Sequence, residues 1–476
     1  MRTIGTALTT SRSIVCLVAS VFSVSSVFLG GTAQTPPPDD ITRLLQDYVR
    51  IDTSNPPGDT RKTADFLAAI LEREGVPVTR YESAPGKAIV YGRLKATVLP
   101  TTAKAVVLLH HMDVVPADRS QWKRDPFSAT VEGNQLWGRG AFDMKGQGIA
   151  QLMAFLALKR RNVPLTRDVI LLAEPDEEVG GAMGARWMIA NHYAELDPEY
   201  VIDEGGMGSR DLFAPGKLVY GIAVAEKKLI WLKVRAEGVA GHGSQPNDQN
   251  PNDRLIRALQ RLLQNDGART PNNGARAFQA SGGRSVESLA LQPPSIVDVM
   301  KARVGTFAEN KFTNAIQRST IAVTWLRSGV GEPPKINVIP SMAEVGLDCR
   351  VLPGTTRDQW LAEIRRRLAD PTLAIELVNE SDDPIVTPQD TPFYRNIEAA
   401  IRQRHPDAIV TPMLIPYGTD SNAFRPKGVK SYGIFPGIVS AEAVASMHGD
   451  AERVPLDAVA EAAEILFAAL RDTLAR

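Results

Sequence analysis

The sequence predicts an α/β fold, and three patterns indicate it. Short apolar runs typical of buried strands alternate with amphipathic segments of helical spacing, as in 105–109 and 146–160. Acidic residues and histidines follow several of these runs, where the sites of open α/β sheets form. From about residue 229 the pattern changes to strands with helices grouped around them, and from about 384 the first pattern returns. We therefore expect an α/β domain interrupted by an inserted α+β module.

The first part of the chain alternates helices with strands. Asp39 or Asp40 can cap a helix over 41–49, and Gly75 can end a helix over 63–74. The helix expected over 146–160 has one apolar face, formed by Ile149, Leu152, Met153 and Leu156. The remaining elements expected here are strands over 79–82, 89–94, 105–109, 168–173 and 200–202, and a helix over 184–191.

The inserted module begins with a strand of alternating polarity over 229–237 and an amphipathic helix over 251–264. A Gly-, Asn-, Arg- and Pro-rich segment, 266–294, is expected to be a loop. Further strands are expected over 319–327, 343–352 and 373–378, with a helix over 357–368. After the module we expect a helix over 393–404, a strand over 431–435 and a last helix over 456–474. The domains are thus 41–228 with 384–476, and the insertion 229–383.

Length and composition set the broad class. The chain has 476 residues, too many for one hydrophobic core, so at least two domains are expected. Hydrophobic residues make up 43% and charged residues 23%, as in ordinary soluble globular proteins. The formal net charge is zero, so the chain has no field that attracts a polyanion, and we exclude nucleic acid as a partner.

The N-terminal segment predicts export. Arg2 and Arg12 precede or flank an apolar, small-residue stretch over 13–30, and Gly-Thr-Ala at 31–33 is a suitable cleavage site. We expect a signal peptide over 1–33, a proline-rich spacer over 34–40, and a periplasmic or secreted location. The alternative is an uncleaved membrane anchor, which the five serines of the stretch disfavour. Cys349 would then be the only cysteine of the mature chain, and we expect a buried thiol.

Polar residues that can bind metal follow the predicted strands. His111 and Asp113 come after the strand 105–109, and positions i and i+2 of an extended chain point to the same side. His111 can therefore bind a metal, while Asp113 orients it or its site. Downstream come Asp143 in Gly-Arg-Gly-Ala-Phe-Asp-Met-Lys-Gly and a pair of glutamates in Asp-Glu-Glu-Val-Gly-Gly. The remaining candidates are Asp203 and the late His448.

This set contains what a two-zinc hydrolase site needs. Asp143 would bridge the ions, His111 and Asp203 would hold one zinc, and Glu178 and His448 would hold the other. Glu177 would be the general base, taking a proton from water and passing it to the leaving amine. Singly, each residue has a structural explanation: Asp143 could cap a helix, and the two glutamates could belong to a solvated loop. The joint pattern, in a chain with six histidines, favours the metal site.

The motifs resemble those of the co-catalytic zinc aminoacylase/carboxypeptidase family over about residues 40–470. This family includes carboxypeptidase S, glutamate carboxypeptidase, aminoacylase and succinyl-diaminopimelate desuccinylase. The resemblance implies a zinc-exopeptidase-type α/β catalytic domain with an inserted, ferredoxin-like α+β domain that serves as lid or dimerisation domain. It also implies that Asp113 orients His111 and that the Asp143–Met144 peptide is cis.

Further motifs match the same family. His242, in 241–246, resembles a histidine of the inserted domain that stabilises the oxyanion, often in the partner subunit's site, which implies a homodimer. Asn337 and Arg350 resemble the residues that clamp the substrate carboxylate, and Gly418 and Thr419 match a loop that closes on substrate. The order Asp-Glu-Gly-Gly at 203–206 and the segment around 314–337 resemble the carboxypeptidase S branch of the family most. Two positions depart from the pattern: His110, either a strand-end residue or a perturbation of the pocket, and Gly243.

The sequence thus predicts an exported, carboxypeptidase-like metallopeptidase with two Zn²⁺ ions, for which Co²⁺ or Mn²⁺ are alternatives. Its substrate would be a small peptide or an N-acyl amino acid, cut at the amide bond next to a free carboxylate. An N-acyl-amino-acid deacylase or a dipeptidase of the same family is the alternative function. A non-catalytic peptide-binding protein is disfavoured, because Glu177 and every expected ligand are present.

Overall fold

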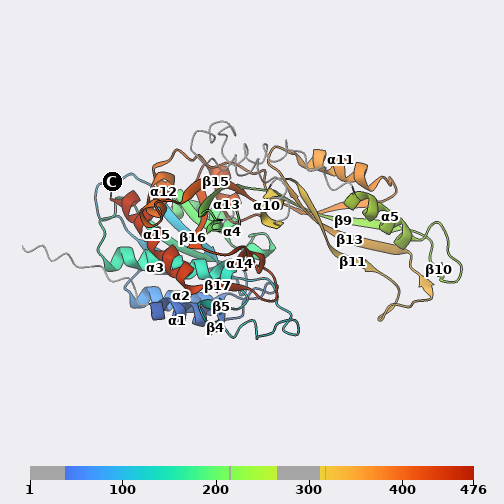
Figure 1. Ribbon diagram of the computed structural model, residues 1–476, viewed down its shortest axis with the longest axis horizontal. Coiled ribbons are helices and arrows are strands. Elements are labelled where there is room, and N and C mark those ends of the chain that lie inside the picture. Colours follow the sequence, from blue (N-terminus) through green and yellow to red (C-terminus); the bar gives the residue numbers. More distant parts are fainter. Residues whose placement is uncertain (1–37, 214–215, 265–310, 317, 476) are drawn as a thin grey trace, which may run out of the picture. The chain divides into compact units, whose positions relative to one another are not determined.

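The computed structural model describes residues 38–213, 216–264, 311–316 and 318–475 (Figure 1). The predicted signal peptide, 1–33, and the predicted loop, 266–294, lie outside these residues. The first helix, α1 (Pro38–Val49), begins inside the segment expected to be a spacer. Asp39 and Asp40 therefore lie within its first turn, and the prediction that one of them caps the helix was wrong.

The larger sheet has eight strands among the described residues. In spatial order they are β1 (Val78–Glu82), β2 (Ala88–Leu94), β6 (Val169–Glu174), β3 (Ala105–His111), β7 (Pro198–Ser209), β16 (Lys430–Ile438), β8 (Val219–Glu226) and β15 (Ile409–Ile415). The four central strands β6, β3, β7 and β16 run parallel, and β1 and β2 extend the sheet antiparallel. The carboxyl ends of the four parallel strands therefore meet along one edge of the sheet, where a site is expected.

Helices cover both faces of this sheet. Side chains alternate between the two faces along each strand, so the apolar strands need cover on both. Val106 and Leu108 of β3 belong to one apolar core, and Val107 and Leu109 belong to another. The helices of the first core are α1, α2 (Arg61–Arg73), α3 (Gly146–Arg160), α12 (Pro392–Arg404) and α15 (Leu456–Leu474). The helices of the second core are α4 (Ala185–Leu196) and α13 (Ser421–Phe424). This arrangement confirms the predicted α/β fold.

Several elements extend beyond their prediction. The helix α3 is buried around its whole circumference as far as Leu158, so its apolar surface is wider than the predicted stripe. The strand β7 has 12 residues, whereas the sequence predicts three, because three glycines interrupt its apolar pattern. The strands β8 and β15 were not predicted. Asp203 consequently lies inside a strand rather than after it.

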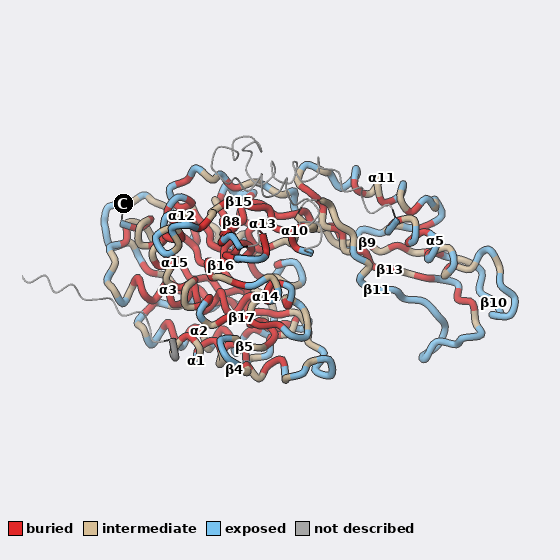
Figure 2. Tube along the Cα trace, in the orientation of Figure 1, coloured by how far each residue is buried: buried red, intermediate tan, exposed pale blue. Residues whose placement is uncertain are grey.

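A second sheet has the order β11 (Thr320–Ser328), β13 (Met342–Val351), β9 (Lys228–Glu237) and β14 (Ala374–Glu380), and every pairing is antiparallel. Ile230, Leu232 and Val234 point to one face and form a separate core with α5 (Pro251–Gln264) and α11 (Arg357–Leu368). Trp231 and Lys233, which alternate with these residues, are half-buried. Figure 2 shows buried and intermediate stretches in the strands of this sheet. This is the inserted α+β module that the sequence predicts.

Smaller elements complete the described residues. β4 (Thr130–Glu132), β5 (Gln135–Trp137) and β17 (Arg453–Pro455) form a three-stranded sheet, and β10 (Gly241–His242) pairs with β12 (Val338–Ile339). The short helices are η1 (Ala141–Lys145), η2 (Glu177–Val179), α10 (Lys311–Ile316), η3 (Arg425–Lys427) and α14 (Ala441–Ala445). Of the helices in the described part of the chain, none has the length and apolarity that a bilayer span requires.

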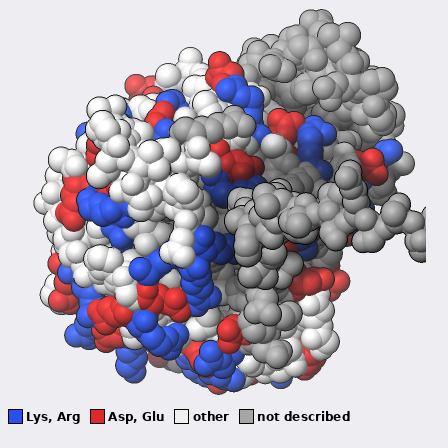
Figure 3. Space-filling model, turned by 90° about the vertical axis from the view of Figure 1, so that its left-hand side faces the viewer, with Lys and Arg blue, Asp and Glu red and all other residues white. Residues whose placement is uncertain are grey.

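The described surface carries mixed charge. On the face that Figure 3 shows, lysines and arginines are interspersed with aspartates and glutamates. This distribution agrees with the formal net charge of zero. Among the described residues of this face, no large single-sign patch that would steer a polyanion is seen.

Candidate metal and substrate site

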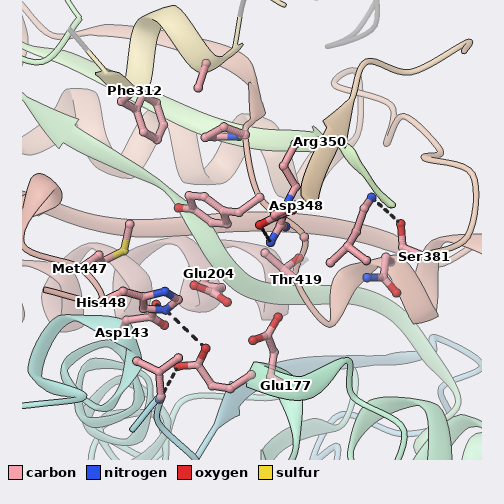
Figure 4. A pocket seen from close by; sticks show the side chains of 18 of the residues that line it. Asp143, Glu177, Glu204, Phe312, Asp348, Arg350, Ser381, Thr419, Met447 and His448 are labelled. Atoms are coloured by element: carbon pink, nitrogen blue, oxygen red, sulfur yellow. Dashed lines mark hydrogen bonds and ion pairs between the residues drawn. The ribbon is translucent and has the colours of Figure 1, made fainter. Parts of the chain in front are cut away.

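Acidic and imidazole side chains converge at the carboxyl end of the central parallel strands (Figure 4). His111 is the last residue of β3, and Glu204 lies in β7. Asp143 lies in η1, directly before α3, and Glu177 and Glu178 open η2 after β6. The late histidine, His448, follows α14. Strand order thus brings together residues that are far apart in sequence.

Asp143 lies between the two histidines. Its Oδ1 is 3.2 Å from Nε2 of His111, and its Oδ2 is 3.1 Å from Nε2 of His448. The same nitrogen of His448 is 3.4 Å from Oε2 of Glu178. The Asp143–Met144 peptide bond is cis, as the family resemblance implies. A carboxylate with one oxygen toward each imidazole has the arrangement that a bridging ligand requires.

The structure replaces Asp203 by its neighbour Glu204 as the candidate ligand beside His111. Asp203 follows Val201 on the sheet face covered by α13, where Ser421 donates two hydrogen bonds of 2.8 Å to its Oδ2. Its Oδ1 accepts from the backbone N–H of Glu204. In contrast, Oε1 of Glu204 is 3.7 Å from Nε2 of His111. Asp203 supports the site from behind, and the prediction that it faces the metal was wrong.

Asp113 positions His111 in part through its backbone. Nδ1 of His111 donates to the carbonyl oxygen of Asp113 at 2.9 Å, whereas Oδ1 of that residue is 3.7 Å away. The Asp113 side chain is fully buried, and its Oδ2 accepts from Asn55 at 2.7 Å and from the N–H of Glu178 at 3.4 Å. A fixed Nδ1–H leaves Nε2 of the ring as the metal-binding atom. Asp113 also links the His111 and Glu178 segments.

Electrostatics of the cluster follow from burial and crowding. Burial raises the pKa of Glu177 and that of Glu204 well above the ordinary value, and nearby carboxylates raise both further. Burial also acts to raise the pKa of Asp143, but hydrogen bonds from His111 and His448 outweigh it and hold that pKa low. For His448, whose side chain is about half exposed, partial desolvation acts to lower the pKa, but Asp143 and Glu178 raise it to about 11. The acidic cluster therefore attracts positive charge.

The donor set fits divalent metal ions. Ligand atoms of His111, Asp143 and Glu178 lie within 4.8 Å of one another, and so do those of His111, Glu177 and Glu204. Imidazole nitrogens and carboxylate oxygens are ligands that zinc accepts, and cobalt and manganese can use the same donors. One ion would be held by His111, Asp143 and Glu204, and the other by Asp143, Glu178 and His448.

The cluster forms the floor of a cavity of about 910 Å³. Figure 4 shows that Phe312 and Met447 lie toward one side of the cavity and that Arg350, Asp348, Thr419 and Ser381 lie toward the other. Further apolar residues of the lining are Leu212, Ala315, Ala441, Val444 and Ala445. The cavity therefore offers both apolar and polar lining residues beside the acidic cluster.

Three of the predicted substrate-binding residues line this cavity: Arg350, Gly418 and Thr419. Arg350 extends from β13 and pairs with Asp348, with Nε 2.8 Å from Oδ1 and Nη2 3.2 Å from Oδ2. The backbone N–H of Thr419 donates to the buried carboxylate of Glu226, which fixes the loop. The guanidinium group of Arg350 is thus held at the polar side of the cavity.

His242 and Asn337 are absent from the cavity lining of the described residues. Both are exposed, and the N–H of Gly243 donates to the carbonyl of Asn337 at 2.8 Å. Arg350 pairs with Leu229 at the start of β9, whereas β10 follows the end of that strand. At about 3.3 Å per residue, the length of β9 puts roughly 25 Å between the two positions. Neither residue therefore contributes to the cavity that the described residues form, and the predicted roles of His242 and Asn337 stay predictions.

Two further expectations concern buried residues. His110 is fully buried, and its Nδ1 lies 3.2 Å from the side-chain oxygen of Gln151 in α3. Burial lowers its pKa to about 3, so it is a neutral core residue and not part of the pocket. Cys349 is buried, and burial raises the pKa of its thiol to about 12. The predicted core thiol is confirmed.

Sequence reasoning missed several residues that line the cavity. Glu204 is in the Asp-Glu-Gly-Gly motif, but only the path of β7 decides which of its acids faces His111. Trp231 and Tyr417 carried no motif signal. The half-buried alternation of β9 could have indicated that the Trp231 face is functional. Phe312 belongs to α10, for which the sequence offered no helical pattern.

The parallel sheet and the paired imidazole–carboxylate cluster define the chain as a metal-dependent hydrolase. Residues 107–472 match the model of peptidase family M20/M25/M40, and the chain belongs to this family. Aminoacylase-1 of Dictyostelium discoideum is 26% identical to it over 404 residues, which cover 83% of this chain and 88% of the relative. The N-fatty-acyl-amino acid synthase/hydrolase PM20D1 of Mus musculus is 27% identical, with coverage of 76% and 72%.

Solved structures share the fold. The M20 family metallo-carboxypeptidase Sso-CP2 from Sulfolobus solfataricus has a TM-score of 0.67 at 20% identity, over 92% of this chain and 100% of that one. Human carnosine dipeptidase 1 has a TM-score of 0.68 at 18% identity, over 92% and 96%. The predicted resemblance is confirmed, and the chain is a metal-dependent amidohydrolase of the aminoacylase, carboxypeptidase or dipeptidase type.

Proposed function

We propose that this protein hydrolyses the amide bond next to a free carboxylate in small peptides or N-acyl amino acids, with two zinc ions. The observation that carries the proposal is the position of Asp143 between His111 and His448, on the floor of a cavity that also contains Arg350. When bound, the metal ions would polarise the scissile carbonyl and lower the pKa of water.

Glu177 is the proposed general base. It lines the cavity beside the candidate ligands, and its pKa is raised by burial and by its acidic neighbours. A carboxylate of raised basicity can take a proton from the attacking water and deliver it to the nitrogen of the leaving amine. The amide bond then breaks, and a carboxylic acid and a free amine are released. The loop of Gly418 and Thr419 would hold the substrate backbone.

The two sides of the cavity suggest an orientation of the substrate. The free carboxylate would lie toward Arg350, whose planar guanidinium can hold it in bidentate fashion. The acyl group or the preceding residue would lie toward Phe312 and Met447, on the apolar side. Relatives named aminoacylase-1 and N-fatty-acyl-amino acid synthase/hydrolase support an N-acyl amino acid with an apolar acyl group as the first substrate class to test.

A substrate panel tests this proposal. Purified zinc-loaded protein should release free amino acid from N-acyl amino acids or dipeptides, and should leave the matching C-terminal amides uncut. Arg350→Ala should raise KM about 10- to 100-fold for the free acids, because a hydrogen bond to a charged group contributes about 1.5–3 kcal/mol. Absence of hydrolysis over the whole panel, or equal hydrolysis of acids and amides, would contradict the proposal.

We also propose a homodimer through the inserted module, in which His242 of a second copy stabilises the oxyanion. The exposed position of His242, in β10 beyond the end of β9 that is remote from Arg350, motivates the proposal. His242→Ala should lower kcat, and a mixture of this variant with Glu177→Gln should regain activity through hybrid dimers. A monomeric mass with full activity would refute the dimer.

Export by the segment 1–33 is likewise a proposal, which N-terminal sequencing of the protein recovered from the periplasm or medium would test.

A further inference from the structure

A buried ion pair lies beside the candidate metal site and joins the two segments that carry Asp143 and His448. Arg139 precedes η1, and Glu452 precedes β17. Their exposed fractions are 2% and 0%, and Nη1 of the arginine donates to Oε2 of the glutamate at 2.6 Å. Neither residue lines the cavity, so neither contacts the substrate. The pair contacts the site through the backbones that it holds.

Each partner holds the backbone of a proposed metal ligand. Oε1 of Glu452 accepts from the N–H of Phe142 at 3.0 Å and from that of Asp143 at 3.1 Å. Nη2 of Arg139 donates to the carbonyl oxygen of His448 at 3.3 Å. The bridging carboxylate and the late histidine are therefore attached to one charged pair, and the pair fixes the distance between their backbones.

The two histidines differ in how firmly the fold holds them. The side chain of His111 is 1% exposed at the end of a central strand. The side chain of His448 is 54% exposed, and its backbone has φ of 60°, a left-handed conformation that a residue with a side chain rarely adopts. Packing therefore contributes little to the position of His448, so the hydrogen bond from Arg139 to its carbonyl matters more.

We infer that Arg139 and Glu452 are positioning residues that hold Asp143 and His448 for metal binding, and that Arg139 acts chiefly on the metal held by Glu178 and His448. This inference rests on the proposed two-metal site. Residues that orient metal ligands typically change metal affinity 10- to 100-fold when they are replaced. The expected result is a protein whose two metal sites lose affinity unequally.

The experiment measures zinc stoichiometry and affinity by competition with a chromophoric chelator. Arg139→Lys keeps the charge but loses the planar fork that reaches both Glu452 and His448. We expect this variant to bind the first zinc like wild type and the second at least about tenfold more weakly. In Glu452→Gln an amide group replaces the carboxylate that faces Arg139. We expect both zinc ions to bind more weakly, because Asp143 would be a ligand of both.

The matched control is Arg167→Lys, in a partly buried Arg167–Glu199 pair that contacts no candidate ligand. It should bind two zinc ions like wild type. A merely structural role of Arg139 would lower the melting temperature of the metal-free variant and leave both affinities unchanged, which would overturn the inference. If Arg139→Lys does not fold, unchanged affinities in Glu452→Gln would overturn it. A wild-type protein that binds fewer than two zinc ions would instead refute the proposed metal site.

Discussion

His448 lies 3.1 Å from the carboxylate of Asp143, although the inserted module separates the two residues in the sequence. Asp143 also contacts His111, so one carboxylate joins both imidazoles. The acids around it are buried and crowded, and their mutual repulsion is relieved only in part by the two histidines. Two divalent cations would neutralise this cluster, and the stability of the protein should depend on them.

Removal of metal should therefore destabilise the fold. A ligand present at 100 times its Kd stabilises the native state by about 2.7 kcal/mol. Two such ions together contribute about 5.4 kcal/mol, so at about 2.1 cal/mol/K of unfolding entropy per residue chelation should lower the melting temperature by about 5 °C, and added zinc should restore it. The check is differential scanning calorimetry with and without chelator. An unchanged melting temperature in protein from which metal analysis shows complete removal would contradict the prediction.

Glu177→Gln should separate catalysis from metal binding. The glutamine keeps the shape of the side chain but cannot accept the proton of water. We expect kcat to fall by about 10²–10⁴, as for the loss of a general base, while zinc content stays at the wild-type value. Steady-state kinetics and metal analysis of the same preparation check this. Full activity would exclude Glu177 as the base, and a loss of zinc would make it a ligand.

Glu204 and Asp203 should behave differently although they are adjacent. Glu204→Ala should lose one zinc ion, because its carboxylate faces His111. Asp203→Asn should retain both ions and unfold at a lower temperature, because it weakens the hydrogen bonds from Ser421. Metal analysis and thermal melts of the two variants decide between the assignments. Loss of zinc in Asp203→Asn alone would restore the assignment that the sequence suggested.

Lys227 should make stability depend on pH. The residue is fully buried, and its Nζ donates to Oγ1 of Thr320 at 3.3 Å. Burial, together with Arg350 and Arg318, lowers its pKa to about 7, from 10.5 in an unfolded chain. Between these values the unfolded state binds more protons, so stability should rise with pH, by at most about 1.4 kcal/mol per unit.

The variant Lys227→Met tests this dependence. Methionine fills similar space without a charge, so we expect a higher melting temperature than wild type at pH 7 and a weaker rise between pH 7 and 9. Lys233→Met is the matched control, because Lys233 lies in β9, the strand that begins directly after Lys227, is half-buried and pairs with Glu376. Equal pH slopes in wild type and Lys227→Met would show that Lys227 stays charged in the folded protein.

The sequence predicted the elements that have strong periodicity. The helices 146–160, 251–264, 357–368 and 456–474 have the same bounds in the structure. The sequence could not predict β7 in full, because glycines at 205, 206 and 208 interrupt the apolar pattern while backbone pairing with β16 and β8 continues the strand. The local strand propensity of the residues does not predict such pairing.

The same limit applies to the site. Motifs identified His111, Asp143, Glu178 and His448, because their residue types are distinctive. The choice between Asp203 and Glu204 depends on where the pairing of β7 with β3 ends and on which face of the sheet Ser421 lies. The position of His242 depends on the length of β9, which separates it from the cavity. These are tertiary relations, and no local pattern contains them.

The central claim is that Asp143 binds two metal ions, one of them together with His111 and Glu204 and the other together with Glu178 and His448. Anomalous diffraction from crystals of zinc-loaded protein, recorded at the zinc absorption edge, tests it most directly. We predict two peaks on either side of Asp143, one against His111 and Glu204 and the other against Glu178 and His448. A single peak, peaks elsewhere in the molecule, or a peak bound by Asp203 in place of Glu204 would contradict the account.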